Sequence, residues 1–273
     1  MIKLIKPFIT FSSIQSELEA IFESGQFTQG KNVERFTQDL KSYLSANYVG
    51  LTTSATTALS LSLRVMGVKS GSKVAVADYS WPATSNVVEE LGGVPVFIDT
   101  DPDTFNMCIK DLKTKLGRDF AAVIFVDTFG NPSGIEDIHK LCKKFNVPLL
   151  EDGACALGSE VDGVKVGSIA DITCFSFHPR KLLNTGEGGA ISTNNNIGKA
   201  SARSIVGFDI GSIIIAAAQK NIIIKGGGHK MAGGFSIKVS NIDKFKKFVF
   251  SKCKGINEDI SSPKPLILDT EIS

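Results

Sequence analysis

The sequence predicts an α/β fold: an open, mostly parallel sheet with helices on both faces, followed by a smaller α/β unit. Short apolar segments typical of buried strands alternate with amphipathic helical segments from residue 13 to residue 193. Glycines stand where several of these helices should end, at Gly25, Gly67 and Gly92. The pattern and the charge both change after residue 197, which predicts a second, separate unit.

Each expected element has its own local pattern: apolar residues three and four apart predict a helix, and short β-branched runs predict a strand. In chain order, we expect helices over residues 13–24 and 33–45, a strand over 48–52, a helix over 56–66, a strand over 74–77, a helix over 83–91, a strand over 95–98, a helix over 109–116, a strand over 121–126, a helix over 135–145, and strands over 147–150, 172–177 and 190–193. Strands separated by helices pair in parallel, and the ligands of such sheets bind beyond the C-terminal ends of the strands.

The composition indicates a soluble, cytoplasmic protein. The 273 residues are 42% hydrophobic, enough for one large core or two smaller ones. No apolar run reaches the length of a membrane span, and the N-terminus lacks the apolar stretch of a signal peptide. The five cysteines are widely spaced and form no CxxC pair, so we expect neither a disulfide framework nor a metal site.

The net charge of +2 conceals two segments of opposite sign. Residues 1–197 carry 18 Lys and Arg against 22 Asp and Glu, a net charge of −4, whereas residues 198–273 carry 12 against 6, a net charge of +6. A basic segment is typical of a solvated surface, but it also fits a module that binds a polyanion. Both interpretations stay open.

Two groups at the expected sheet edge have polar or aromatic character. Ser54, Ala55, Thr56 and Thr57 follow a strand and open a helix, so their N–H groups and hydroxyls can hold a phosphate; ordinary helix capping explains the same residues. Trp81, the only tryptophan, lies in a loop after a strand, where it can stack on a flat ring or simply pack.

Asp152 and Lys181 add an acid and an amine to the same edge. Asp152 ends a strand, where a carboxylate can pair with a protonated ring nitrogen or serve as a turn residue. Lys181 follows another strand and precedes the glycines of residues 186–189, a setting that suits a Schiff-base lysine. An amine, a carboxylate, an aromatic lid and a phosphate cradle together meet the needs of pyridoxal 5'-phosphate.

Several collinear segments carry a family resemblance, namely residues 24–30, 53–59, 92–99, 151–158 and 175–189. Through them, residues 1–194 resemble the N-terminal part of the DegT/StrS family of sugar aminotransferases, which depend on pyridoxal phosphate and have the aspartate aminotransferase fold. The resemblance implies that Lys181 forms the Schiff base, Asp152 pairs with the pyridine nitrogen and Trp81 stacks on the ring. It also implies that Ser176, Ala55 and Thr56 hold the phosphate.

The resemblance further implies an activity: transfer of an amino group from glutamate or glutamine to a keto group on a nucleotide-linked sugar, in a homodimer, with Lys181 as the acid and base. Two positions depart from the family pattern. Ala55 stands where the family usually has glycine, and Cys155 stands where a Gln or His commonly contacts the cofactor. Some variant subfamilies carry out dehydration, so transamination and dehydration are both open.

The C-terminal segment has a different resemblance. Residues 198–205, 207–210 and 225–235 resemble the DHH-associated domain of RecJ, a single-strand-specific DNA exonuclease, and residues 266–269 resemble the start of its next, oligonucleotide-binding domain. Here we expect a helix over 210–219, strands over 222–224 and 236–239, a glycine-rich loop over 226–229 and a helix over 242–250. The resemblance implies single-stranded nucleic-acid binding by Arg203, Ser204, Gly226, Gly227, Gly228 and His229. It implies no nuclease activity, because the catalytic metal-binding domain has no counterpart here.

The expected organisation is therefore chimeric. Residues 1–194 form a truncated aminotransferase large domain, 195–197 a junction, 198–255 the DHH-associated domain and 256–273 a tail. A true fusion, a rearranged reading frame and an assembly artefact all explain the junction. Three hypotheses for function follow: a sugar aminotransferase whose turnover is limited by the absent C-terminal half, a nucleic-acid-binding remnant, and a chimeric product without function.

Overall fold

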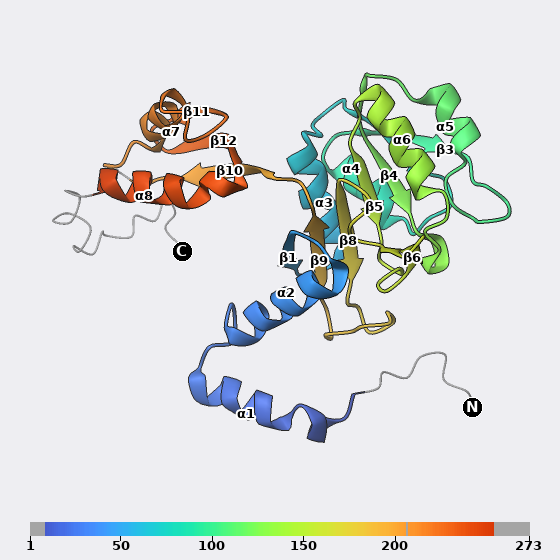
Figure 1. Cartoon of the computed structure of the whole chain (residues 1–273), viewed down its shortest axis with the longest axis horizontal. Coiled ribbons are helices and arrows are strands. Elements are labelled where there is room, and N and C mark those ends of the chain that lie inside the picture. Colours follow the sequence, from blue (N-terminus) through green and yellow to red (C-terminus); the bar gives the residue numbers. More distant parts are fainter. Residues whose placement is uncertain (1–8, 206, 254–273) are drawn as a thin grey trace, which may run out of the picture. The chain divides into compact units, whose positions relative to one another are not determined.

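The computed structural model describes residues 9–205 and 207–253 and divides the chain into two compact units between Asn195 and Asn196 (Figure 1). The expected tail of residues 256–273, with its resemblance at 266–269, lies outside the described residues. Within the described ranges, no helix is both long enough and apolar enough to cross a membrane.

The first unit is built on a seven-stranded sheet in the order β1-β9-β8-β5-β4-β2-β3. Only β9 runs against the others, so the sheet is mostly parallel, as the alternating pattern predicts. The strands are β1 (Tyr48–Thr52), β2 (Lys73–Ala77), β3 (Val94–Ile98), β4 (Phe120–Val126), β5 (Leu149–Asp152), β8 (Ile172–Ser176) and β9 (Gly189–Thr193).

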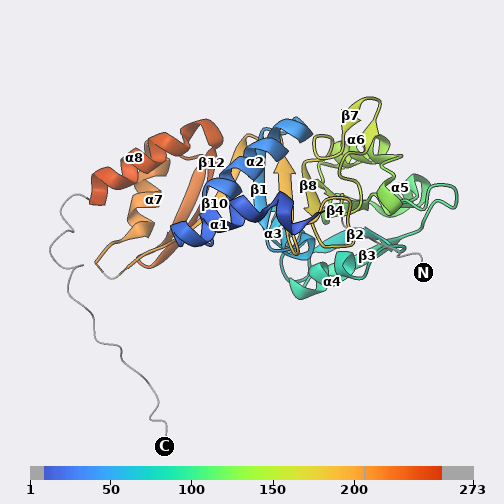
Figure 2. The ribbon, with the colours of Figure 1, turned by 90° about the horizontal axis from the view of Figure 1, so that it is seen from below.

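Helices cover both faces of this sheet (Figure 2). α3 (Ala55–Met66) and α4 (Ala83–Glu90) pack on one face, while α2 (Lys31–Leu44), α5 (Ile109–Lys115) and α6 (Ile135–Phe145) pack on the other. Alternate residues of each strand enter the two cores, which is the periodicity of a sheet buried on both sides. The remaining elements of this unit are η1 (Phe11–Ser13), α1 (Gln15–Ser24), η2 (Thr128–Gly130), β6 (Glu160–Val161) and β7 (Val164–Lys165).

Helix α3 shows how local sequence places a helix terminus at the sheet edge. The Ser54 hydroxyl accepts a hydrogen bond from the Thr57 N–H at 3.1 Å and begins the helix, and Gly67 ends it with a φ of 94°. Leu63 is fully buried on the sheet side, whereas Leu61 is 44% exposed. The N-terminus of α3 therefore lies at the carboxyl end of β1.

The strand expected over 147–150 begins and ends two residues later in the structure, as β5. The Val147 N–H donates to the Cys142 carbonyl and closes the end of α6, and Pro148 has no N–H to donate. The ladder with β4 therefore begins at Leu149 and extends to Asp152. Asp152 is thus held within the sheet rather than in a loop.

The second unit is a three-stranded antiparallel sheet, in the order β10-β12-β11, covered by two helices. Its core contains Ile214 of α7 and Ile237 of β12, with Phe245 of α8 packed against it. The elements are β10 (Ile197–Arg203), α7 (Ile210–Gln219), β11 (Lys225–His229), β12 (Ala232–Lys238), η3 (Val239–Asn241) and α8 (Ile242–Cys253).

Two expectations for this unit are wrong: residues 222–224 are not a strand, and residues 226–229 are not a loop. Ile222 and Ile223 are buried in the core just after α7, and the glycine-rich segment forms β11. A Cβ on Gly226 would lie 2.7 Å from the Ile214 side chain. The glycines therefore let α7 pack directly on the strand. The run of glycines by itself predicts a loop and does not reveal this packing.

A pair of leucines on α3 tests how this helix packs on the sheet of the first unit. Leu63→Ala should lower the free energy of unfolding by about 2–5 kcal/mol, because it leaves a cavity in a closed core. The matched change Leu61→Ala, at an exposed position of the same helix, should stay within about 0.5 kcal/mol of the wild type. Urea unfolding followed by circular dichroism measures both; equal losses would contradict the assigned faces of α3.

Candidate active site

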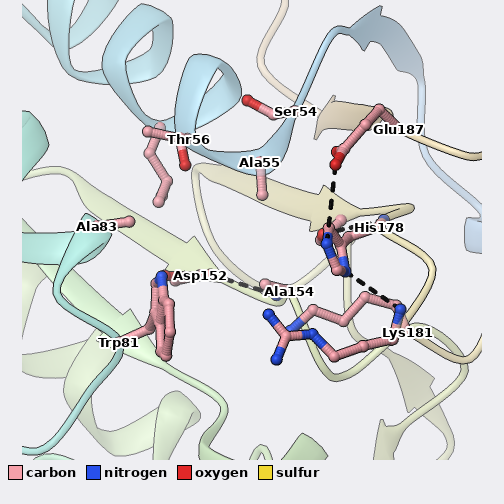
Figure 3. A pocket seen from close by; sticks show the side chains of 13 residues that line it. Ser54, Ala55, Thr56, Trp81, Ala83, Asp152, Ala154, His178, Lys181 and Glu187 are labelled. Carbon is pink, nitrogen blue, oxygen red and sulfur yellow. Dashed lines mark hydrogen bonds and ion pairs between the residues drawn. The ribbon is translucent and has the colours of Figure 1, made fainter. Parts of the chain in front are cut away.

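A cavity of about 500 Å³ lies at the carboxyl edge of the first sheet (Figure 3). Its walls come from the N-terminus of α3, the loop before α4, the end of β5 and the segment after β8. The structure brings together here every site residue that the sequence predicted for this unit: Ala55, Thr56, Trp81, Asp152, Ser176 and Lys181. Sequence reasoning assigned no role to Thr84, Arg180, His178 or Glu187, although the last three also line the cavity.

Asp152 presents a buried carboxylate to this cavity. Its Oδ2 accepts a hydrogen bond from the Thr84 hydroxyl at 2.9 Å, and its Oδ1 accepts one from the Ala154 N–H at 3.3 Å. Burial raises the pKa of Asp152, while the Thr84 bond and, more weakly, the charge of Lys181 act in the opposite direction. A buried carboxylate held in this way is stabilised by a cationic partner, such as a protonated ring nitrogen.

Thr84 was missed because a threonine in the first turn of a helix is an ordinary residue. It lies 68 positions before Asp152 in the chain and meets it only because α4 packs beside the end of β5. No local signal predicts that contact.

Lys181 is held by a turn that folds back on itself after β8. The Phe177 N–H donates to the Gly188 carbonyl at 2.8 Å, and the Lys181 N–H donates to the His178 carbonyl at 2.8 Å. The Nζ of this side chain donates to the Cys155 Sγ at 3.0 Å. The amine is therefore held beside Asp152 and Trp81, within reach of an aldehyde bound there.

The opposite wall consists of the first turn of α3, against which the start of β9 packs. A Cβ on Gly189 would lie 2.5 Å from the Ser54 carbonyl carbon and 2.7 Å from the Ala55 nitrogen, so glycine is needed for β9 to lie against this turn. Ser54 caps the helix, as expected if these residues form an ordinary helix N-terminus. Capping is compatible with a phosphate site, because an α-helix leaves its first N–H groups without partners inside the helix.

Trp81 faces the same cavity and is 73% exposed, so it is not a core residue. Its carbonyl accepts a hydrogen bond from the Thr84 N–H at 3.0 Å, which ties the loop to the first turn of α4. An exposed indole beside a buried carboxylate can cover one face of a planar ring. The residues present thus fit pyridoxal 5'-phosphate: an amine, a buried carboxylate, an aromatic plane and a helix N-terminus.

Behind the cavity, two further carboxyl groups, those of Glu151 and Asp127, lie on the other face of the sheet. Glu151 precedes Asp152 in β5 and therefore points away from it. It accepts a hydrogen bond from the Thr173 hydroxyl at 2.5 Å and contacts Asp127. Within residues 9–205 and 207–253, no N–H or hydroxyl donor reaches the Asp127 oxygens or Glu151 Oε1.

Two buried carboxyl groups in contact must share a proton. Burial raises the pKa of Asp127 well above its ordinary value, and the charge of Glu151 adds to this, so Asp127 is the member of the pair that keeps the proton. Burial also raises the pKa of Glu151 from 4.5 to about 7, despite the opposing bond from Thr173.

In the second unit, the sheet register groups basic residues on one face. Arg203 of β10 and His229 of β11 both lie opposite Ala232 of β12, and Lys199 and Lys225 both lie opposite Ser236. Residues opposite each other or two apart along a strand point to one face, so all four basic side chains share it. Sequence reasoning named Arg203 and His229 but missed the two lysines, because only the register aligns them.

The other residues named for nucleic-acid binding lie differently. The Ser204 hydroxyl donates to the Phe208 carbonyl, and the Ser204 N–H donates to the Met231 carbonyl at 2.9 Å, so Ser204 ties β10 to the β11–β12 turn. By their register, Gly226 and Gly228 lie on the face of the sheet that packs against α7, whereas Gly227 lies on the opposite face with the four basic residues.

The profile of the DegT/DnrJ/EryC1/StrS aminotransferase family matches residues 10–241. The chain is 37% identical over 187 residues to the UDP-4-amino-4,6-dideoxy-N-acetyl-beta-L-altrosamine transaminase of Campylobacter jejuni, covering 66% of this chain and 49% of that protein. It is 30% identical over 194 residues to the GDP-perosamine synthase of Escherichia coli O157:H7, covering 71% and 53%.

Among solved structures, the PLP form of Spr1654 from Streptococcus pneumoniae superposes with a TM-score of 0.67 at 30% identity, covering 71% of this chain and 53% of that one. These similarities confirm the aspartate aminotransferase-like α/β fold with its mostly parallel sheet. The chain spans about half the length of the curated relatives it matches.

The Asp127–Glu151 pair predicts a pH dependence of stability. Glu151 has an ordinary pKa of 4.5 and a folded pKa of about 7, so between these values the folded chain holds a proton that the unfolded chain releases. Stability therefore falls as the pH rises through this window and levels off above it. Glu151→Gln removes this titration and supplies an amide donor to Asp127.

We expect the melting temperature of Glu151→Gln, relative to the wild type, to be higher at about pH 8 than at about pH 5. Thermal unfolding at both pH values measures this difference. The exposed Glu160→Gln serves as the control and should show no such change. A constant difference between Glu151→Gln and the wild type would show that Glu151 does not titrate in this window.

Proposed function

Because the chain belongs to the DegT/DnrJ/EryC1/StrS aminotransferase family, we propose that its first unit binds pyridoxal 5'-phosphate and transfers an amino group to a keto group on a nucleotide-linked sugar. The observation that carries this proposal is the convergence of Lys181, Asp152 and Trp81 with the N-terminus of α3 in one cavity. These residues come from four separate segments of the chain, and each suits one part of the cofactor.

The roles follow from the positions of the side chains. Bound pyridoxal phosphate supplies an electron sink for charge that develops on the substrate carbon. Asp152 stabilises a positive charge on the ring nitrogen, and Trp81 covers the ring and excludes water from that side. The N–H groups of Ala55 and Thr56 and the Ser176 hydroxyl hold the phosphate. Lys181 would hold the aldehyde through its amine, and the same amine would serve as the acid and base at the substrate carbon.

The relatives support the proposed substrates. Two of them are named for products or substrates on UDP and GDP carriers, which supports a nucleotide-linked sugar. Others are named for glutamate and glutamine as amino donors, which supports one of these two for this chain. We also propose a homodimer as the working form. Cys155 leaves dehydration as the alternative reaction at the same site.

Cofactor attachment gives the direct test. Incubation of the full chain with pyridoxal phosphate should produce the visible absorbance band of a lysine-bound cofactor, which borohydride then fixes to Lys181. The band should be absent in Lys181→Ala and unchanged in Lys113→Ala, an exposed lysine of α5. Asp152→Asn should weaken binding by about tenfold or more, because the ring nitrogen loses its anionic partner.

A wild-type chain without the band, or a band that survives in Lys181→Ala, would overturn the assignment. Peptide mapping of the borohydride-reduced protein identifies the attached lysine independently of any turnover.

The second unit supports a second candidate function, the binding of single-stranded nucleic acid by a DHH-associated domain of the RecJ type. The observation that favours it is the face carrying Lys199, Arg203, Lys225 and His229. Between these side chains lie Ala232, which is half-buried, and Gly234, which is exposed, and neither has a long side chain to cover the backbone. Basic residues along a shallow surface with small residues between them suit a polyanion.

Binding to a labelled single-stranded oligonucleotide at several salt concentrations tests this candidate. Each of Arg203→Ala and Lys225→Ala should weaken binding and reduce the slope of log K against log salt by about 0.7. Lys244→Ala, an exposed lysine of α8, serves as the control and should have little effect. Binding that does not respond to salt or to either change would argue against this surface.

A further inference from the structure

Cys155 and Lys181 form a thiol–amine pair at the mouth of the candidate active site. Lys181 Nζ donates to Cys155 Sγ at 3.0 Å, so no atom lies between them. Cys155 is exposed, and both residues line a cavity of about 320 Å³ on the Asp127 side of the site. A small oxidant dissolved in water can therefore reach the sulfur.

The fold holds the backbone on the cysteine side of this pair in place. A Cβ on Gly130 would lie 2.7 Å from the Cys155 carbonyl oxygen, so glycine lets the η2 segment pack directly against Cys155. The Ser159 hydroxyl donates to the Gly130 carbonyl at 2.6 Å, and the Ala156 N–H donates to the Gly153 carbonyl at 2.9 Å. Because the backbone on both sides of Cys155 is bonded, the thiol keeps its place opposite the amine.

The other thiols have different surroundings. Cys142 and Cys174 are buried, and burial raises the pKa of Cys142 to about 12, which keeps it in the unreactive thiol form. Cys108 and Cys253 are partly exposed. All five cysteines are free of disulfides. Among the described residues, Cys155 is the thiol that accepts a hydrogen bond from a lysine.

We propose that Cys155 and Lys181 are a modification site, at which peroxide joins the two side chains through a covalent sulfur–nitrogen bond. Peroxide first oxidises the Cys155 thiol to a sulfenic acid, breaking the O–O bond and releasing one water. The neutral amine of Lys181 then attacks the sulfur, the S–O bond breaks and a second water leaves. The sulfur loses two electrons to the peroxide, and the protein loses two hydrogen atoms.

Contact between the two groups favours this reaction over its competitors. A sulfenic acid with a nucleophile already beside it condenses faster than one that waits for a second protein molecule or a second peroxide. The nucleophile in contact with Cys155 is the amine of Lys181.

The bond would use the same nitrogen that the proposed function assigns to pyridoxal phosphate, and in this respect the inference rests on that function. The two states of Lys181 then exclude each other: bound cofactor protects Cys155 from cross-linking, and the cross-linked chain does not take up the cofactor. Thiol reductants cleave the bond and restore the free amine. The formation of the bond itself does not depend on cofactor binding.

Mass spectrometry of the full chain tests the proposal. After treatment of the cofactor-free protein with limiting hydrogen peroxide, the intact mass should fall by two hydrogens. Trypsin should then release a single species joining the peptide of residues 145–165, which contains Cys155, to that of residues 181–199, which begins with Lys181. Dithiothreitol should separate the two peptides, and loading with pyridoxal phosphate before peroxide should reduce their yield.

Matched variants sharpen the result. The linked species should be lost in Cys155→Ser and in Lys181→Arg, and should persist in Cys108→Ser. Three results would each overturn the proposal: oxidation of Cys155 to a sulfinic acid with Lys181 unmodified, a disulfide between two chains, or no change at Cys155. If the linked species forms in a chain that never binds pyridoxal phosphate, the cross-link is upheld and the proposed function is contradicted. If the chain binds the cofactor but forms no linked species, the proposed function is upheld and the cross-link is contradicted.

Discussion

The backbone pairing of β5 with β8 is the constraint on which the candidate active site depends. Its parallel register joins Leu150 to Ile172, Glu151 to Thr173 and Asp152 to Cys174. Two strands separated by about twenty residues thereby end at the same edge, and the turn after β8 returns Lys181 towards the loop after β5. The first turn of α3, against which β9 packs at Gly189, forms the opposite wall.

The alternation of side chains along β5 separates two neighbouring acids into different environments. Asp152 faces α4 and the cavity, where Thr84 and Ala154 donate to it and a cationic ligand can balance its charge. Glu151 faces the other core, where Thr173 donates to it and Asp127 shares a proton with it. One strand therefore supplies an anion to the site and stores a proton behind it, because successive residues of a strand point to opposite faces.

The second unit follows a different principle. Its glycines serve the packing of α7 on β11, and the register of three antiparallel strands then aligns basic residues that lie far apart in the sequence. The same segment thus contributes an apolar face to its own core and a basic face to the surface. Three of the basic residues that contribute to the positive charge of the segment, Lys199, Arg203 and Lys225, thus share one face of the sheet.

The sequence alone determined most elements of the first unit, its mostly parallel sheet, and the roles expected of Lys181, Asp152 and Trp81, because caps, periodicity and motifs depend on residues within a few turns of one another. Only the tertiary structure decided that β5 begins at Leu149, that residues 225–229 form a strand, and that Thr84 reaches Asp152. It also decided the contacts of Cys155 with Lys181 and of Glu151 with Asp127. These features depend on strand order, register and helix packing, which join residues distant in the chain and leave no local pattern.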